Sequence, residues 1–486
     1  MTLLDQLSAL DPASLDQVFA DISPSLLSEL EKQLSQTLTL HEYIKLAWPQ
    51  VEPSTPYIDG WHLSVIAEHL TAVSEGQLRN LLITIPPRHA KPVAIDALVL
   101  TADGIRRPLA SIEVGDSIIS HTGQPVTVEA VHEQGDLPIL RITTESGRTV
   151  EAAYDHPFLT PEGWIAAGDL KVGQTLATVV PCDRPKTKVS RPEEEFRLAG
   201  YYIGDGNTTT HGHVQASSIT CFDNAQADDV EYCAYVLGFK VLRQTGLGRL
   251  SISGGARVWL RSVGLAGKTS WTKRVPEFVF RGSNEQIGHF LGAYFACDGS
   301  LNQRDKARHD LAITIGSVAK PLLQDVQHLL LRIGVRSRIR EHTVQHNNFT
   351  GGPYTSWRLT ITSQDDTAKF IARVPVFGQK MAKLAAWGIQ RRAFDTCLLP
   401  DAIISIEPAG EKPCRCLTVS DNHSFLANDI AVHNSLTAAV FWPTWEWTQR
   451  PHRRWLFSSY ALPLSIRDSV KCRRLIESPW YQRNYS

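Results

Sequence analysis

Four consecutive residues, Val432-His-Asn-Ser435, combine side chains that can break and remake a peptide bond. The side-chain amide of Asn434 can attack its own main-chain carbonyl, which cuts the bond to Ser435 and leaves a succinimide. His433 can transfer the proton that this step requires, and the hydroxyl of Ser435 can accept an acyl group. The motif therefore predicts a rearrangement of the chain's own backbone at residues 434–435.

Cysteines offer a second class of nucleophile. The eight cysteines are scattered without a paired CxxC…CxxC pattern, which argues against structural zinc and a disulfide framework and suits a reducing cytosol. Cys416 lies in a strand-like stretch, Cys416-Leu-Thr-Val419. If this stretch is a strand, Cys414 points to the same face as Cys416. The residues alone leave both thiols open as the attacking group.

A doubled acidic motif points to a different chemistry. Leu198–Gly206 and Leu291–Gly299 each read as an apolar helix, rich in small residues, that ends in Asp-Gly. If the two helices pack side by side, Asp205 and Asp298 meet at one end. Two adjacent carboxylates are costly unless a cation neutralises them, so Mg²⁺ is the expected occupant. Metal ions held in this way assist the attack of water on a phosphodiester.

The acidic motifs belong to a longer internal repeat. Leu237–Leu242 is similar to Ile333–Arg338, and Arg249–Ser253 is similar to Arg358–Thr362. The three matches occur in the same order twice, which indicates a duplicated unit of helices and strands.

Basic residues alternate along one of these repeated stretches. Arg336, Arg338 and Arg340 are predicted to share one face of a strand, and Lys240 falls in the matching stretch of the first copy. Such a row suits DNA phosphates and guanine edges. A solvated sheet face is the alternative, and the neighbouring carboxylates favour DNA.

Residues 193–390 resemble the LAGLIDADG homing endonucleases in their single-chain, two-repeat form. The resemblance implies an α+β domain that cuts double-stranded DNA with Mg²⁺ bound by Asp205 and Asp298. It also implies that Lys273, in Lys273-Arg-Val-Pro276, lies near the cleavage centre and stabilises phosphate charge or poises a water. The alternative is a decayed enzyme in which the paired helices are only a core.

Four further blocks resemble the splicing blocks of inteins; they are Val93–Gly104, Gly147–Phe158, Arg415–Val419 and Val432–Ser435. The resemblance implies an all-β Hint horseshoe built from residues 92–190 and 395–434, with the endonuclease inserted and no cofactor needed for splicing. His156 matches the family histidine that polarises the upstream scissile amide. At Ala153, Phe158 and Val432 the chain departs from the residues that these inteins usually carry.

The first residue of this intein-like segment, Pro92, has no side-chain nucleophile. Cys416 stands where class three inteins carry their initiating thiol. The resemblance implies that Cys416 attacks the carbonyl of Lys91, that Ser435 then takes the acyl group, and that cyclisation of Asn434 and an O-to-N shift complete the joining.

The flanks, residues 1–91 and 435–486, form one motif when 92–434 is removed. Leu81–Lys91 then continues into Ser435 as a strand, a loop, Lys-Ser and a helix. This resembles the Walker A segment of phage terminase large subunits, which are α/β P-loop ATPases. It implies that Lys91 and Ser435 bind ATP-Mg²⁺ only after joining, and that terminase and portal proteins are partners. With no Walker B strand after Ser435, we expect an incomplete motor.

Composition and local patterns define the elements that must position these groups. The 486 residues are 43% hydrophobic and 20% charged, with 50 acidic against 49 basic residues, as in soluble multidomain proteins. No apolar run approaches the ~18 residues of a membrane span, so we expect a cytoplasmic protein of a bacterial host, encoded by a phage or prophage. Helical spacing dominates both flanks, and short strands dominate 92–185.

The combined prediction is a multidomain chain: an all-β Hint domain, an inserted α+β two-repeat LAGLIDADG endonuclease, and flanking α/β P-loop ATPase fragments. The preferred function is autocatalytic splicing plus site-specific DNA cleavage. The alternatives are a packaging motor alone and a Hint module that is inactive in splicing or only cleaves.

Overall fold

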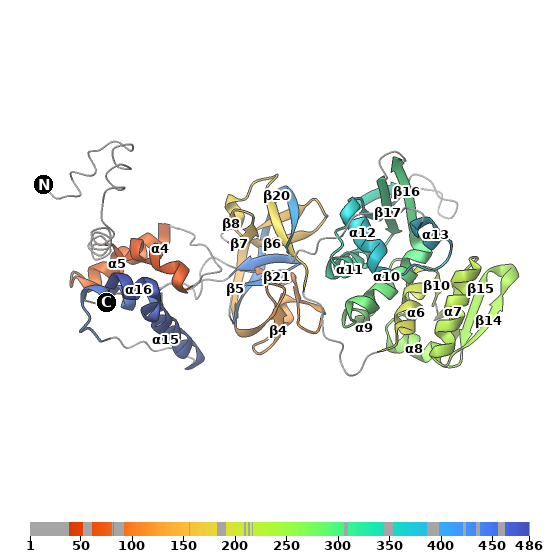
Figure 1. Cartoon of the computed structure of the whole chain (residues 1–486), viewed down its shortest axis with the longest axis horizontal. Coiled ribbons are helices and arrows are strands. Elements are labelled where there is room, and N and C mark those ends of the chain that lie inside the picture. The colour runs from red at the N-terminus through yellow and green to blue at the C-terminus, as the bar shows by residue number, and fades with distance from the viewer. Residues whose placement is uncertain are drawn as a thin grey trace. The chain divides into compact units, whose positions relative to one another are not determined.

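The computed structural model forms two compact units, one from Ala90–Asn434 and one from both flanks, Met1–His89 with Ser435–Ser486 (Figure 1). None of the helices in the described part of the chain is long and apolar enough to cross a membrane. The structure describes residues 38–51, 61–79, 81, 92–154, 156–181, 191–208, 210–211, 214–215, 217–305, 310–344, 353–385, 398–420, 424–433, 438–454 and 462–485.

The flanking unit is helical. Its helices are α4 (Leu40–Val51), α5 (Trp61–Ser74), α14 (Ala438–Gln449), α15 (Leu462–Glu477) and α16 (Pro479–Tyr485). They share one hydrophobic core, in which the ring of Trp48 stacks on Phe441 at 5.7 Å. The indole of Trp445 donates to the carbonyl of Leu38 at 3.0 Å, and that of Trp442 donates to Ser74 at 3.1 Å. Segments from before and after residues 92–434 therefore pack together while this stretch is still part of the chain.

The β-rich part of the second unit is built from two separate stretches. The first supplies β1 (Val93–Ala94), β2 (Leu98–Leu100), β3 (Arg106–Pro108), β4 (Ser117–Ile119), β5 (Pro125–Thr144), β6 (Thr149–Ala153), β7 (Pro157–Thr160), β8 (Gly163–Ala166) and β9 (Thr175–Val179). The second supplies β20 (Leu398–Val419), β21 (Ser424–Ala427) and β22 (Ile430–His433). They form one sheet in the order β3-β2-β21-β22-β9-β20-β1-β6-β5-β4, and β7 joins β22 to β8.

Two long strands organise this sheet. β20 pairs with β9 at its start and with β5 along most of its length, and bulges in the β5–β20 register let the pair bend. β1 is short and lies between β20 and β6. The beginning and the end of the predicted splicing segment therefore belong to the same sheet.

A two-residue turn joins β21 to β22. Both turn residues, Asn428 and Asp429, have positive φ angles of 50° and 69°, as the tight turns favoured in β-hairpins require. The side chain of Asn428 accepts from the N–H of Leu98 and donates to the carbonyl of Thr149, both at 2.8 Å. The side chain of Asn428 thus anchors the hairpin to the rest of the sheet.

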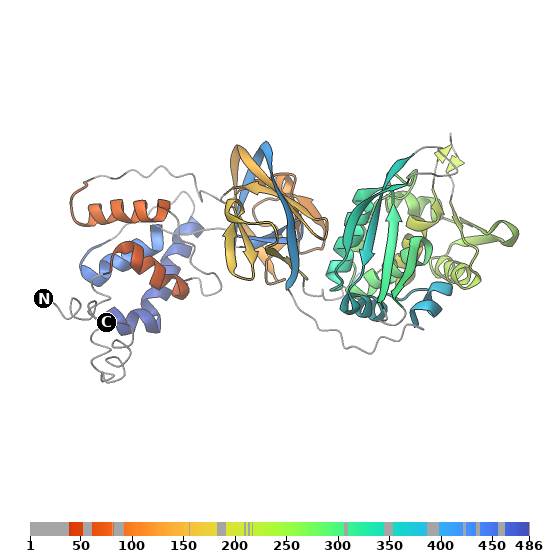
Figure 2. The same cartoon turned by 90° about the horizontal axis from the view of Figure 1, so that it is seen from above.

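The remainder of this unit is a duplicated α+β fold, as the internal repeat predicts. One copy contains α6 (Glu193–Gly204), β10 (Gly206–Asn207), β13 (Ser218–Thr220), α7 (Asn224–Val236), β14 (Lys240–Gln244) and β15 (Arg249–Ser253). The other contains α10 (Asn284–Asp298), β16 (Gly299–Asp305), β17 (Asp310–Ser317), α11 (Lys320–Arg332), β18 (Arg338–Val344) and β19 (Tyr354–Ile361). The sheets have equivalent orders, β10-β13-β15-β14 and β16-β17-β19-β18. Figure 2 shows this part of the unit, coloured from yellow-green to teal, from above.

Shorter elements complete this part of the unit. They are β11 (Thr210–His211), β12 (Val214–Gln215), α8 (Ala256–Ser262), α9 (Glu277–Phe280), α12 (Gln364–Arg373) and α13 (Gln379–Ala385).

Helices α6 and α10 pack directly against each other (Figure 1). Small residues allow this approach: a Cβ atom at Gly200 would lie 2.5 Å from the carbonyl oxygen of Phe290, and one at Gly204 would lie 2.3 Å from the Cβ of Cys297. The capping box of Ser283 and Gln286 fixes the start of α10. The pairing brings the C-terminal ends of both helices together.

Candidate functional sites

The first site lies where α6 and α10 end. Asp205 is the residue that caps α6, and Asp298 is the last residue of α10. Both side chains are exposed, so a cation can reach them from solvent. The helix packing thus brings together the two carboxylates that the doubled motif predicts.

The two carboxylates influence each other electrostatically. Partial loss of hydration and, next, the negative charge of Asp205 raise the pKa of Asp298 to about 6. Loss of hydration also raises the pKa of Asp205, although a hydrogen bond from Cys297 opposes the shift. Two carboxylates that resist ionising together form a suitable binding site for a hard divalent cation, which would neutralise both. The residues therefore fit Mg²⁺.

Lys273 reaches this site from the segment that joins the two copies. Its ammonium donates to the carbonyls of Ile203, Gly204 and Gly206 at 2.8, 3.2 and 3.0 Å, and its side chain is buried. An ammonium has three N–H groups, and all three are engaged by the end of α6. Lys273 thus lies beside the carboxylates as predicted, but its donors are directed at backbone carbonyls.

Lys380 of α13 is the counterpart of Lys273 that the sequence reasoning missed. Its ammonium donates to the carbonyls of Phe295, Ala296 and Cys297 at 3.2, 2.7 and 2.8 Å, at the end of α10. A cation at a helix C-terminus is stabilised by the free carbonyls. The internal repeat is the signal that could have revealed it, since a duplicated unit with one capping lysine predicts a second.

The predicted basic row is only partly formed. Arg340 is exposed on β18 and lies directly opposite Arg358 of β19. Lys240 is exposed at the start of β14, opposite Ser253. Arg338 is also on β18, and it forms an ion pair with Glu145 of the β-rich part at 2.6 Å.

The placement of Arg336 in this strand row is wrong. β18 begins at Arg338, and Arg336 lies before it. The backbone N–H and the guanidinium of Arg336 both donate to Asp366, at 2.9 and 3.0 Å, because this buried carboxylate needs donors at the start of α12. Arg336 is thus held against α12.

The second site lies where β1 meets β20 and β6. Val93 is opposite Arg415, and Ala94 is opposite Cys414. The carbonyl of Pro92 accepts a hydrogen bond from the N–H of Ala153 at 3.1 Å. Extending the β1–β20 register by one residue aligns Pro92 with Cys416, which is fully buried.

The two candidate thiols have different surroundings. Cys414 packs in a small apolar cluster with Ala94 and Ile139, and burial raises its pKa to about 11. Cys416 lies opposite His132 of β5, whose Nε2 is 3.0 Å from the hydroxyl of Thr418. Cys416 therefore lies opposite a polar side chain, whereas Cys414 faces an apolar cluster.

His156 lies between the two ends of the intein-like segment. It is fully buried, its N–H donates to Ala153 at 3.0 Å, and its ring packs edge-on against Phe158 at 5.3 Å. Phe158 is opposite Val432 of β22. The same short stretch of chain thus contacts the strand leading to each predicted junction.

The junction residues Lys91, Asn434 and Ser435 lie outside the described residues, as does most of the predicted Walker A segment. His433 is described only as the last residue of β22, where it is opposite Ser424. The predictions for these side chains therefore stay predictions.

A histidine that the sequence reasoning did not single out lies beside this strand end. The Nδ1 atom of His121 is 2.5 Å from the hydroxyl of Ser424, the residue paired with His433. Burial lowers the pKa of His121. Because His121 and Ser424 are 303 residues apart, no local pattern could have connected them.

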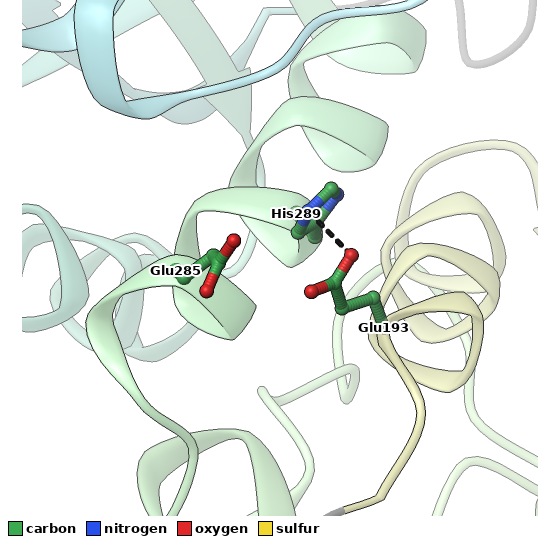
Figure 3. A group of neighbouring side chains, drawn as sticks. All are labelled: Glu193, Glu285 and His289. Atoms are coloured by element: carbon green, nitrogen blue, oxygen red, sulfur yellow. Dashed lines mark ion pairs between the residues drawn. The ribbon is translucent and has the colours of Figure 1, made fainter. Parts of the chain in front are cut away.

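Within the part of the chain that the structure describes, one other group has side chains of metal-binding type. Glu193 of α6 and Glu285 and His289 of α10 have ligand atoms within 4.8 Å of one another (Figure 3). The dashed line in Figure 3 joins His289 to Glu193, at 3.0 Å. Acidic side chains are favourable in the first turn of a helix, so this group reads as an ion pair between two helix starts.

Comparison with protein families identifies one part of the chain. Residues 285–375 match the model of the LAGLIDADG-like domain. This range contains α10 from its second residue on, with Asp298, and the sheet with Arg338 and Arg340.

Several curated proteins are similar over longer stretches. The replicative DNA helicase DnaB of Rhodothermus marinus is 26% identical over 444 residues, which cover 72% of this chain and 46% of the helicase. Protein RecA of Mycobacterium tuberculosis is 27% identical over 269 residues, 52% of this chain and 33% of RecA. The chain thus spans less than half the length of these relatives. The flanks make up less than a third of the chain, so both matches must extend into Ala90–Asn434.

Solved structures of inteins are among the structural neighbours. The DnaB intein of Synechocystis sp. is 12% identical, with a TM-score of 0.25, and the match covers 71% of this chain and 99% of that one. A mutant of the Ssp DnaB mini-intein variant M86 is 13% identical, with a TM-score of 0.27, over 71% and 99% of the two chains.

Proposed function

We propose that this chain excises residues 92–434 and joins its flanks. The main support is the β1–β20 register, which aligns Cys416 with Pro92, the residue after the predicted upstream junction. A nucleophile and its target must approach within about 3–3.5 Å to react. The contact of His156 with Phe158, which is opposite Val432 of β22, and the common core of the two flanks add to this support.

The proposed reaction uses only groups of the chain. The thiolate of Cys416 attacks the carbonyl carbon of Lys91, and the nitrogen of Pro92 leaves with a proton, giving a branched thioester. The hydroxyl of Ser435 then attacks the thioester and returns the thiol to Cys416. The side-chain nitrogen of Asn434 attacks its own carbonyl and releases the amine of Ser435.

That amine then attacks the ester on its own hydroxyl, which restores an ordinary peptide bond between the flanks. His156 acts on the upstream amide as a proton donor, in line with its buried position beside β6. The products are the two flanks, joined by a peptide bond, and an intein that ends in a succinimide.

Mass spectrometry of the expressed chain tests this function. Splicing yields a product of residues 1–91 joined to 435–486 and a separate product of residues 92–434. Cys416→Ala removes both products, whereas Asn434→Ala lets the acyl group pass to Cys416 and Ser435 but blocks release of the intein. Splicing by Cys416→Ala at the wild-type rate would refute the role of this thiol, and an intact wild-type chain would refute splicing itself.

We also propose that the duplicated α+β part cuts double-stranded DNA at a specific site. The pairing of Asp205 and Asp298 at adjacent helix ends, with raised pKa values, supports this proposal. Bound Mg²⁺ at these carboxylates would polarise the phosphate and lower the pKa of water. Lys273 and Lys380 hold the helix ends in place, and Arg340, Arg358 and Lys240 are available to DNA phosphates.

A plasmid with the uninterrupted flank sequence is the test substrate for this activity. We expect a single double-strand cut with Mg²⁺, none in EDTA, and none with Asp205→Asn. Asp228→Asn, an exposed acid of α7 that pairs with Arg243, is the matched control and should cut normally. A wild-type protein that binds the plasmid but leaves it uncut would indicate the decayed alternative.

For the host protein we propose a nucleotide-binding loop of the terminase type, completed when Lys91 and Ser435 are joined. The common core of the two flanks supports this, because it holds both sides of the future loop in one unit. Binding of a fluorescent ATP analogue by the joined product, and loss of binding in Lys91→Ala, would test it. Equal binding by the unspliced chain would contradict it.

A further inference from the structure

The turn between β21 and β22 contains an aspartate with a backbone conformation that favours glycine. Asp429 has a φ of 69°, where glycine is the favoured residue of a tight hairpin turn. Its side chain is nevertheless only 4% exposed. Burying a carboxylate in a turn that prefers glycine is unfavourable unless the carboxylate makes strong interactions. The contacts of this side chain explain why it is stable there.

Asp429 is held by groups from two parts of the unit. Nδ1 of His328, on α11 of the duplicated part, lies 2.8 Å from Oδ1 of Asp429. The guanidinium groups of Arg148 and Arg106, from the β-rich part, lie 3.5 and 3.7 Å from its other oxygen. Burial opposes the charge, but these three partners hold the pKa of Asp429 well below its usual range.

His328 is suited to donate this hydrogen bond. It is fully buried, and burial lowers its pKa to about 4, so the ring is neutral at pH 7. A neutral imidazole has one N–H, and the short contact with Asp429 indicates that Nδ1 carries it. The positive charges of Arg106 and Arg332 also disfavour a second proton on this ring, which packs against Phe280 at 6.1 Å.

Further contacts hold α11 in place in the turn of helix that precedes His328. Arg106 pairs with Asp325 at 3.1 Å, and Arg274 grips the same carboxylate at 2.6 and 2.9 Å. The carbonyl of Ser146 accepts from Gln327 and from the N–H of Ile339, both at 2.9 Å. The position of His328 relative to the turn is therefore set by several directional bonds, with the buried carboxylates matched by guanidinium groups.

The turn determines where the downstream junction lies. β22 covers only Ile430–His433 and leads directly to Asn434, so about 13 Å of strand separates the turn from the predicted reaction. We propose that His328 is a positioning residue for the downstream splice reaction, acting through Asp429, so that the endonuclease insert is part of the splicing apparatus. This inference rests on the proposed splicing function.

The contact between His328 and Asp429 is called the clamp below. Hydrogen exchange tests the clamp without relying on any splicing. In the full-length chain with Asn434→Ala, we expect His328→Leu to speed exchange of the amides of β21 and β22 about tenfold, the effect of losing one hydrogen bond to a charged group. His328→Asn keeps a side-chain N–H near the position of Nδ1 and should restore protection. His289→Leu, in the same domain but bonded to Glu193, is the matched control and should leave the hairpin unchanged.

Separate measurements of the reaction at each junction distinguish a positioning role of His328 from a general loss of stability. Cleavage after Asn434, measured in a Cys416→Ala chain, should slow about tenfold with His328→Leu. Thioester formation at Lys91, measured by thiol-induced cleavage in an Asn434→Ala chain, should change less than about twofold, because β1 and β20 form the upstream site whereas His328 bonds to Asp429 in the turn before β22. A loss of both reactions together would overturn the proposal and indicate general destabilisation.

A double-mutant cycle gives the decisive comparison. Asp429→Gly suits the turn and removes the carboxylate, so His328→Leu should have no additional effect on β22 exchange in that background. Equal effects of His328→Leu with and without Asp429 would refute the clamp. If the wild-type chain does not splice but the exchange results hold, the splicing function fails and the clamp stands.

Discussion

Val93 and Arg415 are directly opposite each other in the antiparallel pair of β1 and β20. Residues paired in this way have Cα atoms about 4.5–5.5 Å apart, and the next pair outward is Pro92 with Cys416. A thiol encoded more than three hundred residues away is thus aligned with the first residue of the predicted insertion. The two cysteines of β20 should therefore respond differently to mutation.

We expect Cys416→Ala to abolish splicing and Cys414→Ala to preserve it. Cys414 packs against Ala94 and Ile139, and a thiol with a pKa of about 11 is rarely a thiolate at neutral pH. Removing one sulfur from that cluster should cost about 1 kcal/mol of stability. Mass spectrometry of both variants checks the prediction, and splicing by Cys416→Ala together with its loss in Cys414→Ala would assign the initiating role to Cys414.

Lys380→Met should reduce DNA cutting and destabilise the α10 end. The substitution removes three donors to helix carbonyls and a cation beside Asp298, which should lower stability by about 1–2 kcal/mol. Lys383→Met, at an exposed lysine of the same helix α13, is the control and should alter neither property. Urea unfolding and plasmid cleavage measure both effects, and equal behaviour of the two variants would contradict a special role for Lys380.

Asp298 should make the metal-free protein more stable at pH 5 than at pH 7. Its folded pKa of about 6 lies above the usual value of 3.8, so the folded state binds the proton more tightly than the unfolded state. The resulting stabilisation is complete below pH 3.8 and is lost as the pH rises through about 6. Asp298→Asn should flatten this part of the profile in EDTA, and an unchanged pH dependence would exclude the raised pKa.

Arg340 and Arg336 should separate DNA affinity from stability. Arg340→Ala should weaken binding to DNA and lower the salt slope by about 1, as the loss of one phosphate contact does. Arg336→Ala should leave binding intact but destabilise the fold by about 1 kcal/mol, because buried Asp366 loses its partner. Fluorescence anisotropy at several salt concentrations and thermal unfolding distinguish them, and a binding defect in Arg336→Ala would return it to the DNA-contacting set.

The sequence predicts the parts of this fold that repeat or alternate. The doubled Asp-Gly helices, the two equivalent sheets and the strand texture around Cys416 are all visible as periodic patterns. Alternation alone cannot show where a strand begins. Arg336 therefore lies outside β18, because its N–H bonds to Asp366 instead of to a neighbouring strand. Local propensity does not reveal such tertiary contacts.

The contacts that connect distant segments were not predictable in this way. Lys380 of α13 caps the end of α10 as Lys273 caps the end of α6, and only the internal repeat, not a local pattern, could have suggested this correspondence. His328 and Asp429 are 101 residues apart, and each looks ordinary in its own surroundings. Only the folded arrangement shows that a histidine of one domain and a turn residue of another share a hydrogen bond.

The common core of the flanks has a practical consequence for following the reaction. Trp48 and Phe441 already stack before any bond is broken. If both junctions were cut without ligation, the severed ends would stay bound to each other, as in a nicked protein whose fragments remain complexed. Size exclusion or a native gel would therefore give the same result for ligated flanks and for cleaved flanks. Only a denatured sample distinguishes ligation from cleavage.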